Sequence, residues 1–389
     1  MSKLWISLGL IFGLISCTSS TKSIDYLGQS YPDMIPLIFA PDIVSVKGRL
    51  DHGISFTPDT QEVAFGVLDK EDFSGDIWYA KKESEGWTRP AIFEPLKGQS
   101  VYLPYFSPDG QSMLFAKSVS DTNKYVTDIW RLQKNKGTWS DPKKEGHPIS
   151  SLEREASACM SLDKTIYFSS NRDSNSSGTA DLYVSSLENG TYTNAKRIDV
   201  ISSERDEESI FVAPDEDYII FSRYATNENA PDLWISYQDA TKKWTQPRSL
   251  DATINTSDWE RRPFVSADHN FLFFTRLQMD EKGLAESDIY WVHTKKVFKP
   301  FVFNPITTQT IKVGKETTVS IPTDYFKDID QEQLEISFNN ENVKWASFDS
   351  STMILTMHPD EVGEFEVIFS TVDAFSNETN DRVKIIVAE

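Results

Sequence analysis

Phe106-Ser107-Pro108-Asp109-Gly110 is the stretch of sequence that decides the fold, because variants of it recur along the chain. Proline sets φ for a tight turn, and aspartate and glycine tolerate the turn conformations that follow. The corresponding stretches are Phe56-Thr57-Pro58-Asp59, Met160-Ser161-Leu162-Asp163, Val212-Ala213-Pro214-Asp215 and Val265-Ser266-Ala267-Asp268. Their aspartates are 50 to 54 residues apart. The chain therefore contains a unit that is repeated five times.

Other positions recur at a similar distance from these turns in every unit. In the second unit, the turn is followed by the aromatic strand Met113-Leu114-Phe115, the aspartate-led strand Asp128-Ile129-Trp130 and the closing aromatic Trp139. Each unit therefore predicts four short strands joined by turns. Four strands in a unit of 50 to 54 residues are typical of a β-propeller blade. A stacked solenoid is the structural alternative, but its units are usually shorter.

These units resemble the TolB-like, WD-like propeller repeats, which share the order F-S-P-D-G, aromatic strand and D-I-W/Y. The resemblance covers residues 33–303 and implies an all-β propeller domain. It does not imply one function, since such repeats occur in scaffolds, in gating domains of peptidases and in lyases. Residues 31–45 resemble an outer strand and are expected to complete the last blade. We therefore favour five blades, with six as the alternative.

The N-terminal residues predict an exported lipoprotein. Lys3 precedes the apolar run Leu4 to Ile15, which is too short to span a bilayer and suits a signal peptide. Leu14-Ile15-Ser16-Cys17 resembles a bacterial lipobox, which implies lipidation of Cys17 and a signal peptide of residues 1–17. An ordinary secretory signal with a chance cysteine is the alternative. We expect residues 18–32 to form a tether, and the protein to lie at the outer membrane, facing the periplasm or the cell surface.

Composition and missing motifs exclude several function classes. The net charge of −20 argues against nucleic acid or anionic lipid as a partner, so membrane contact is expected through the lipid anchor alone. No G-x-S-x-G motif follows the repeats, which excludes a propeller-gated serine peptidase. Only His52 of the five histidines maps to the channel mouth, so a zinc site is not expected. Cys159 is the lone cysteine after Cys17 and cannot form an internal disulfide.

The repeat stops after Asn304, and residues 304–389 predict a small β-sandwich. Strands are expected at 317–321, 334–338, 365–369 and 383–387, where apolar and polar residues alternate. The segment resembles the cadherin-like, dystroglycan-type immunoglobulin-fold domains of bacterial surface proteins in Phe326-Lys327-Asp328-Ile329-Asp330 and Asp373. Aspartates of that family can hold Ca²⁺. Asp328, Asp330 and Asp373 are therefore weak calcium candidates, and no other cofactor is expected.

Candidate site residues follow from propeller geometry, which places the start of each first strand beside the end of each second strand at the channel mouth. Counting eight residues back from each turn aspartate gives a carboxylate in four of five units: Asp51, Glu155, Glu207 and Glu260. The adjoining positions of the second strands supply the cations Lys117, Arg172, Arg223 and Arg276. Neighbouring positions add His52, Arg154, Asp206, Arg261 and Arg262, with Trp259 and Tyr102 as aromatic residues within reach.

Two interpretations of this rim compete. The residues can form salt bridges that hold neighbouring blades in register. They can also form a recognition site, in which charged groups bind polar ligands and aromatic rings stack on a sugar. Our main prediction is a non-catalytic binding or scaffold protein that recognises an envelope protein or a glycan at the channel mouth. The alternative is a carbohydrate-active enzyme, a glycoside hydrolase or lyase, with Glu155, Glu207 and Glu260 as its acid and base. A third possibility is envelope assembly through the sandwich domain, with the propeller as a platform.

Overall fold

The computed structural model describes residues 24–120, 123, 125–173, 179–224, 230–280, 283–330, 334–341 and 343–389. The predicted signal peptide and Cys17 lie outside these residues. The described elements are strands, apart from the 3₁₀ turns η1 (Glu94–Leu96) and η2 (Thr294–Lys296). Among the described residues, we find no helix with the length and apolar character needed to cross a membrane.

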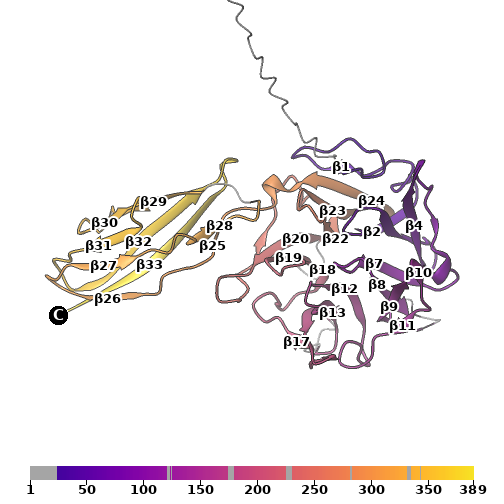
Figure 1. Cartoon of the computed structure of the whole chain (residues 1–389), viewed down its shortest axis with the longest axis horizontal. Coiled ribbons are helices and arrows are strands. Elements are labelled where there is room, and N and C mark those ends of the chain that lie inside the picture. Colours follow the sequence, from indigo (N-terminus) through magenta and orange to yellow (C-terminus); the bar gives the residue numbers. More distant parts are fainter. Residues whose placement is uncertain are drawn as a thin grey trace, which may run out of the picture.

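The repeated units form blades arranged around a central axis (Figure 1). Each blade is an antiparallel sheet whose strands follow the chain order outward from the axis. The first blade contains β2 (Leu50–Phe56), β3 (Glu62–Leu68), β4 (Gly75–Glu83), β5 (Gly86–Trp87) and β6 (Ala91–Ile92), and the second contains β7 (Val101–Phe106), β8 (Ser112–Ser118), β9 (Thr127–Asn135), β10 (Thr138–Trp139) and β11 (Lys143–Lys144). The third contains β12 (Glu155–Met160), β13 (Ile166–Ser170), β14 (Asp181–Ser185) and β17 (Lys196–Arg197), with the hairpin of β15 (Leu187–Glu188) and β16 (Thr191–Tyr192). The fourth contains β18 (Glu207–Val212), β19 (Tyr218–Tyr224), β20 (Pro231–Tyr237) and β21 (Arg248–Ser249), and the fifth contains β22 (Trp259–Val265), β23 (Phe271–Asp280), β24 (Gly283–His293) and β1 (Leu37–Ile38).

The N-terminal strand closes the ring. β1 pairs with β24, so that Leu37 lies opposite Trp291, and the amide of Phe39 donates to Ile289 O at 2.7 Å. The innermost strand of the first blade, β2, contacts both β7 of the second blade and β22 of the fifth. In the part of the chain that the structure describes, the five-bladed propeller is therefore confirmed, and residues 31–45 complete the last blade as expected.

Residues 24–32 pack on the propeller, where the sequence suggested a tether. The side chain of Tyr26 is 1% exposed. Its ring meets Phe56 edge-on at a centroid distance of 5.3 Å and Phe271 at 5.5 Å. The tether expectation is wrong for this stretch, because burial of an aromatic ring outweighs the cost of ordering a few polar residues around it.

Each innermost strand contains one residue with left-handed backbone geometry. These residues are Gly53, Leu103, Ser157, Ser209 and Arg262, with φ between 49° and 65°. The pairing register to the second strand shifts at each of them. An extra residue of this kind is a β-bulge, which reverses the faces to which the side chains before it point. This repeated bulge decides which residues line the channel.

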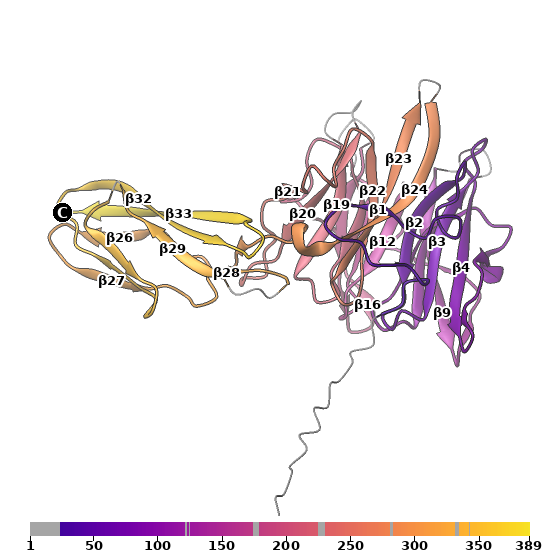
Figure 2. The ribbon, with the colours of Figure 1, turned by 90° about the horizontal axis from the view of Figure 1, so that it is seen from above.

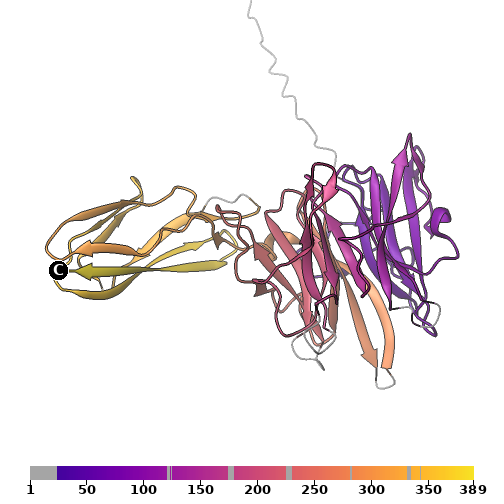
Figure 3. The same ribbon diagram turned by 90° about the horizontal axis from the view of Figure 1, so that it is seen from below.

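The C-terminal residues form the predicted two-sheet sandwich (Figure 3). One sheet contains β26 (Gln309–Lys312), β29 (Glu335–Asn339), β32 (Gly363–Val372) and β33 (Glu378–Ala388), and the other contains β27 (Thr317–Ser320), β30 (Ala346–Asp349) and β31 (Ile354–Met357). Leu355, Val367, Phe369 and Ile385 are buried between the sheets. β25 (Phe301–Val302) pairs with β28 (Phe326–Lys327) where the sandwich meets the propeller.

The sandwich and residues 24–32 both contact the turns that join the first and second strands of the blades. Lys327 Nζ lies 2.6 Å from Asp217 Oδ2, in the turn between β18 and β19. The hydroxyl of Tyr26 donates to Asp268, in the turn between β22 and β23. Figure 2 shows the sandwich extending sideways from the propeller. The opposite ends of β18 and β22 are thus left to form the channel mouth.

Candidate functional site

The predicted rim carboxylates are buried groups that hold loops in place. The side chains of Asp51, Glu155, Glu207 and Glu260 are 0% exposed. Glu207 lies opposite Arg223 and Glu260 opposite Arg276, so the expected pairs do come together. Glu260 accepts hydrogen bonds from Thr256 N at 3.0 Å, Thr256 Oγ1 at 2.7 Å and Arg276 Nε at 2.7 Å. Its carboxylate therefore fixes the loop that enters its own strand.

The other three carboxylates repeat this arrangement. Glu155 accepts from Ser151 N at 2.8 Å and from Arg172 Nη2 at 3.2 Å. Glu207 accepts from Ser203 N at 2.9 Å and from Arg223 Nε at 2.8 Å. Asp51 accepts from Val46 N at 2.8 Å and from Arg49 Nε at 2.7 Å.

The cations of these pairs stack on aromatic rings of the same blade, and so does Lys117, whose Nζ donates to Gln99 Oε1 at 2.7 Å. The distances to the ring centroids are 5.0 Å for Arg49 on Trp78, 4.4 Å for Lys117 on Trp130, 4.9 Å for Arg172 on Phe168, 4.8 Å for Arg223 on Trp234 and 4.6 Å for Arg276 on Tyr290. Their positive charges and N–H donors already interact with groups of the same blade. The expectation that these carboxylates and cations form a shared ligand-binding rim is therefore wrong, because each set is buried in its own blade.

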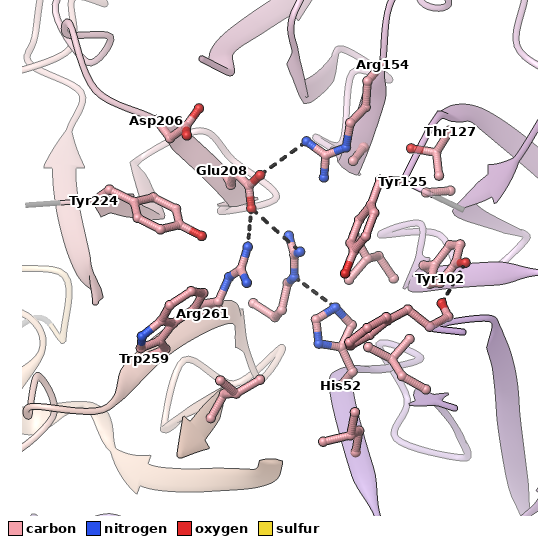
Figure 4. Close-up of a pocket in the computed structure, with 18 of the residues that line it drawn as sticks. His52, Tyr102, Tyr125, Thr127, Arg154, Asp206, Glu208, Tyr224, Trp259 and Arg261 are labelled. Atoms are coloured by element: carbon pink, nitrogen blue, oxygen red, sulfur yellow. Dashed lines mark hydrogen bonds and ion pairs between the residues drawn. The ribbon is translucent and has the colours of Figure 1, made fainter. Parts of the chain in front are cut away.

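A pocket of about 630 Å³ does open at this mouth, and all five blades contribute to it (Figure 4). Its volume is in the range of small-molecule binding sites. The residues flanking the buried carboxylates in sequence point into it. Its lining residues are Leu50, His52, Leu68, Phe73, Tyr102, Leu103, Ala116, Tyr125, Thr127, Arg154, Ala156, Asn171, Asp206, Glu208, Tyr224, Trp259, Arg261, Arg262, Leu277 and Met279.

Glu208 lies at the centre of a cluster of guanidinium groups. Its Oε1 is 3.2 Å from Arg154 Nη1, and its Oε2 accepts a hydrogen bond from Arg261 and lies 3.7 Å from Arg262 Nη2. Burial alone would raise the pKa of Glu208, but the three guanidinium groups hold this pKa well below its usual range. Glu208 is therefore ionised at neutral pH.

Arg262 and His52 form the polar floor of the pocket. Arg262 Nε donates to His52 Nε2 at 3.2 Å, and Arg262 Nη1 donates to Ser209 Oγ at 2.6 Å. Burial and the adjacent arginines lower the pKa of His52 well below its ordinary value. His52 is therefore neutral, and its Nε2 accepts, which places its proton on Nδ1.

Asp206 faces the same pocket, but its surroundings shift its pKa in the opposite direction. It lies directly before β18, two residues before Glu208, and both side chains line the pocket. Its carboxyl accepts from Ala180 N, and its carbonyl accepts from Tyr224 N at 3.1 Å. Burial, with a contribution from the charge of Glu208, raises the pKa of Asp206. The surroundings thus shift the pKa values of the two carboxyl groups in opposite directions.

Aromatic side chains form the walls. The rings of Tyr224 and Trp259 meet edge-on at 5.8 Å, and the Arg261 guanidinium lies 5.8 Å from the first and 5.6 Å from the second. Tyr102 stands across the pocket, with its hydroxyl donating to Phe73 O at 3.0 Å (Figure 4). Trp259 and Tyr102 therefore lie in the pocket, as the sequence suggested.

The pocket residues that sequence reasoning missed include Glu208, Tyr125 and Tyr224. Glu208 directly follows the predicted Glu207 and precedes the bulge residue Ser209. The acidic pair Glu207-Glu208 is visible in the sequence. Counting alternate positions back from the turn, however, selects Glu207 and not Glu208. Tyr125 lies in the loop before β9, at a position that is not part of the repeat.

The calcium candidates lie together in the sandwich without forming a recognisable metal cage. Asp328 is 4% exposed, and neither of its carboxyl oxygens has a hydrogen-bond partner among the residues that the structure describes. Burial, together with the charges of Asp330 and Asp373, raises the pKa of Asp328 to about 7. Among the residues that the structure describes, no group of three or more His, Cys, Asp or Glu is arranged to hold a metal ion. Calcium binding stays a prediction.

Comparison with known proteins places the fold. No protein-family model matches the chain, and no curated protein matches it. The similar solved structures include a glycoside hydrolase (TM-score 0.44, 8% identity, 67% of this chain and 91% of that one). They also include an endo-arabinase from Bacteroides thetaiotaomicron (0.40, 12%, 67% and 96%) and the catalytic domain of a GH62 α-L-arabinofuranosidase from Coprinopsis cinerea (0.42, 8%, 67% and 97%).

These matches correct the functional prediction. The sequence suggested a binding or scaffold protein without catalytic activity, whereas the similar structures are glycoside hydrolases and other enzymes. These matches do not support the prediction of a non-catalytic module, which is withdrawn, and its alternative, a carbohydrate-active enzyme, remains a proposal. At these identities and TM-scores the likeness concerns the fold. No residue role passes from those proteins to this chain.

Proposed function

We propose that the protein is a carbohydrate-active enzyme that cleaves glycosidic bonds in the central pocket. Glu155, Glu207 and Glu260 are not its catalytic groups, since they are buried in their blades. The observation that carries the proposal is the pair Asp206 and Glu208, whose pKa values are shifted in opposite directions within one pocket. Environments that separate two carboxyl groups in this way are typical of acid–base sites.

The surroundings of this pair suit a sugar. Both side chains line the pocket, Asp206 directly before β18 and Glu208 within it. Tyr224 and Trp259 offer aromatic faces beside the pair, on which the apolar face of a pyranose can stack.

Asp206 is the proton donor in this proposal. In hydrolysis, a water oxygen bonds to the anomeric carbon as the bond from that carbon to the leaving oxygen breaks. The leaving oxygen takes the proton of Asp206, and the proton that the water loses restores it. Because burial raises the pKa of Asp206, this carboxyl keeps its proton at a higher pH than an exposed aspartate does. Glu208 stays ionised, and it holds Arg154, Arg261 and Arg262 in fixed positions around the substrate.

A panel of polysaccharides and oligosaccharides tests the proposal through release of reducing ends. The wild-type protein should cleave at least one of them. Asp206→Asn should lower kcat on that substrate by about 10²–10⁴-fold with a small change in KM, because the proton donor is lost. Asp199→Asn is the matched control, since that side chain is 85% exposed, and it should leave kcat unchanged. No cleavage of any glycan, or full activity of Asp206→Asn, would overturn the proposal.

We also propose that a lipid on Cys17 tethers the enzyme to the outer membrane. The position of Tyr26 at the strand-one-to-strand-two turns supports this, because it leaves the pocket mouth at the other end of the blades, away from an anchored N-terminus. Metabolic labelling with a fatty-acid analogue should mark the wild type and not Cys17→Ser. Labelling of the variant would refute the anchor. For the sandwich, the two sheets and the position of Asp328 and Asp330 support a cadherin-like, dystroglycan-type assignment.

A further inference from the structure

The pocket carries more positive charge than its carboxylates neutralise. Arg154, Arg261 and Arg262 line it together with Glu208 and Asp206. Glu208 provides one firm negative charge, and burial disfavours the charged form of Asp206. The three guanidinium groups therefore leave an excess of one to two positive charges when the pocket is empty. This excess is unusual in a chain with a net charge of −20.

Two of these arginines also have hydrogen-bonding capacity to spare. The Nε groups of Arg154 and Arg261 are buried and have no hydrogen-bond acceptor among the described residues. Their side chains are 22% and 14% exposed, so part of each guanidinium still reaches the pocket. A buried donor without an acceptor costs about 1–3 kcal/mol. An anion with several acceptor oxygens would relieve the excess charge and accept hydrogen bonds from the exposed part of each guanidinium.

The shape and the walls indicate which kind of anion. A cavity of about 630 Å³ is far larger than an inorganic ion needs. The guanidinium of Arg261 lies against the rings of Tyr224 and Trp259, so charged and aromatic surfaces adjoin. Guanidinium groups bind planar carboxylates through two parallel hydrogen bonds, and aromatic faces accept sugar rings.

We propose that the substrate of this pocket is an acidic glycan, in which a uronic-acid unit places its carboxylate on Arg154 and Arg261. The inference rests on the proposed function and names its substrate class. Glu208 then has a second role, because it keeps the arginines in place while leaving enough positive charge to attract the sugar carboxylate. Neutral sugars would leave that excess charge uncompensated in a partly dry site, which selects against them.

Calorimetric binding measurements with three matched ligands test this inference. The ligands are a galacturonic-acid oligosaccharide, its methyl ester and a sulfated galactose oligosaccharide of the same length. The non-cleaving Asp206→Asn protein is used beside the wild type. The uronate should bind at least tenfold more tightly than its methyl ester, and added salt should reduce this preference. Equal affinity for acid and ester, tighter binding of the sulfated sugar, or no binding of the uronate would overturn the inference.

Substitutions test whether the arginines cause the preference for the uronate. Arg154→Gln should remove most of the preference for the uronate, while Arg154→Lys, which keeps the charge, should retain part of it. Arg382→Gln is the matched control: that side chain is 66% exposed in the sandwich, and the variant should bind like the wild type. Circular dichroism confirms that each variant is folded. A preference that survives Arg154→Gln in folded protein counts against the inference.

The outcomes separate this inference from the proposed function. If the wild type binds the uronate selectively but cleaves no glycan, the substrate class stands as a ligand class and the enzyme proposal fails. If it cleaves a neutral glycan and shows no preference for the acid, the enzyme proposal stands and the acidic-substrate inference fails.

Discussion

Adjacent residues in the innermost strands of this propeller have opposite roles. Glu207 is buried against Ser203 and Arg223, whereas Glu208, the next residue, faces the pocket. The same holds for Glu260 and its neighbours Trp259 and Arg261. Side chains alternate along a strand, so a shift of one residue exchanges a structural group for a functional one.

Asp328 is a residue whose ionisation should affect stability. Burial and its acidic neighbours raise its pKa from 3.8 to about 7 in the folded protein. The folded state therefore binds a proton more tightly than the unfolded state, and the free energy of unfolding should fall as pH rises from about 4 to about 7. Asp328→Asn removes this charge. We expect it to raise the free energy of unfolding at pH 8 by about 1–3 kcal/mol and to flatten its pH dependence.

Urea unfolding of the sandwich at pH 5 and pH 8, in EDTA and in calcium, measures this effect. Asp360→Asn, at an exposed position of the same domain, serves as the control. A loss of stability in calcium-containing buffer on Asp328→Asn would contradict the idea of an uncompensated charge and would point instead to a bound cation.

At the scale of single elements, the loop-and-carboxylate arrangement of four of the five blades should contribute to the stability of those blades. Glu155 accepts from Ser151 N and Ser170 Oγ, both at 2.8 Å, with its side chain fully buried. Glu155→Gln replaces an acceptor oxygen with a donor that faces other donors. We expect the free energy of unfolding to fall by about 1–3 kcal/mol.

Chemical unfolding compares this variant with Glu153→Gln, whose side chain is exposed two residues earlier. The control should unfold like the wild type. Equal stability of Glu155→Gln and the wild type would show that these carboxylates are not the structural groups described above.

The N-terminal strand β1 should be part of the propeller's cooperative unit. Phe39 is 0% exposed, and its ring lies 5.1 Å from those of Phe273 and Trp291. Phe39→Ala should therefore cost about 3–5 kcal/mol of propeller stability, as for large aromatic residues in other cores. Ile35→Ala, at a site that is 70% exposed, should cost little. Thermal unfolding gives the comparison, and a Phe39→Ala protein as stable as the wild type would mean that β1 merely lies on the surface.

The whole molecule shows which parts of the architecture the sequence could predict. The turn aspartates, the aromatic strands and the closing Trp or Tyr recur at fixed spacing, so the blades and their closure by residues 31–45 followed from the repeat. The cross-strand partners of Glu207 and Glu260 were also placed correctly. Long, strongly periodic segments are where pattern reasoning is most dependable.

The site could be predicted only in part, because its position depends on backbone geometry that the pattern does not reveal. Leu103, Ser157, Ser209 and Arg262 adopt φ values near 50°, although none of them is glycine. The bulge at each of these positions reverses the alternation, so that Asp206 and Glu208 reach the pocket and Glu207 does not. Tyr125 comes from a loop that no period describes.

The central claim is that the pocket formed by all five blades binds a glycan and that Asp206 protonates the leaving oxygen. A crystal structure of Asp206→Asn with a bound acidic oligosaccharide tests it most directly. We predict that the sugar lies between Tyr224 and Arg154, with a glycosidic oxygen within hydrogen-bonding distance of the side chain at position 206. A glycan bound elsewhere on the molecule, or one whose glycosidic oxygens all point away from this side chain, would contradict the account.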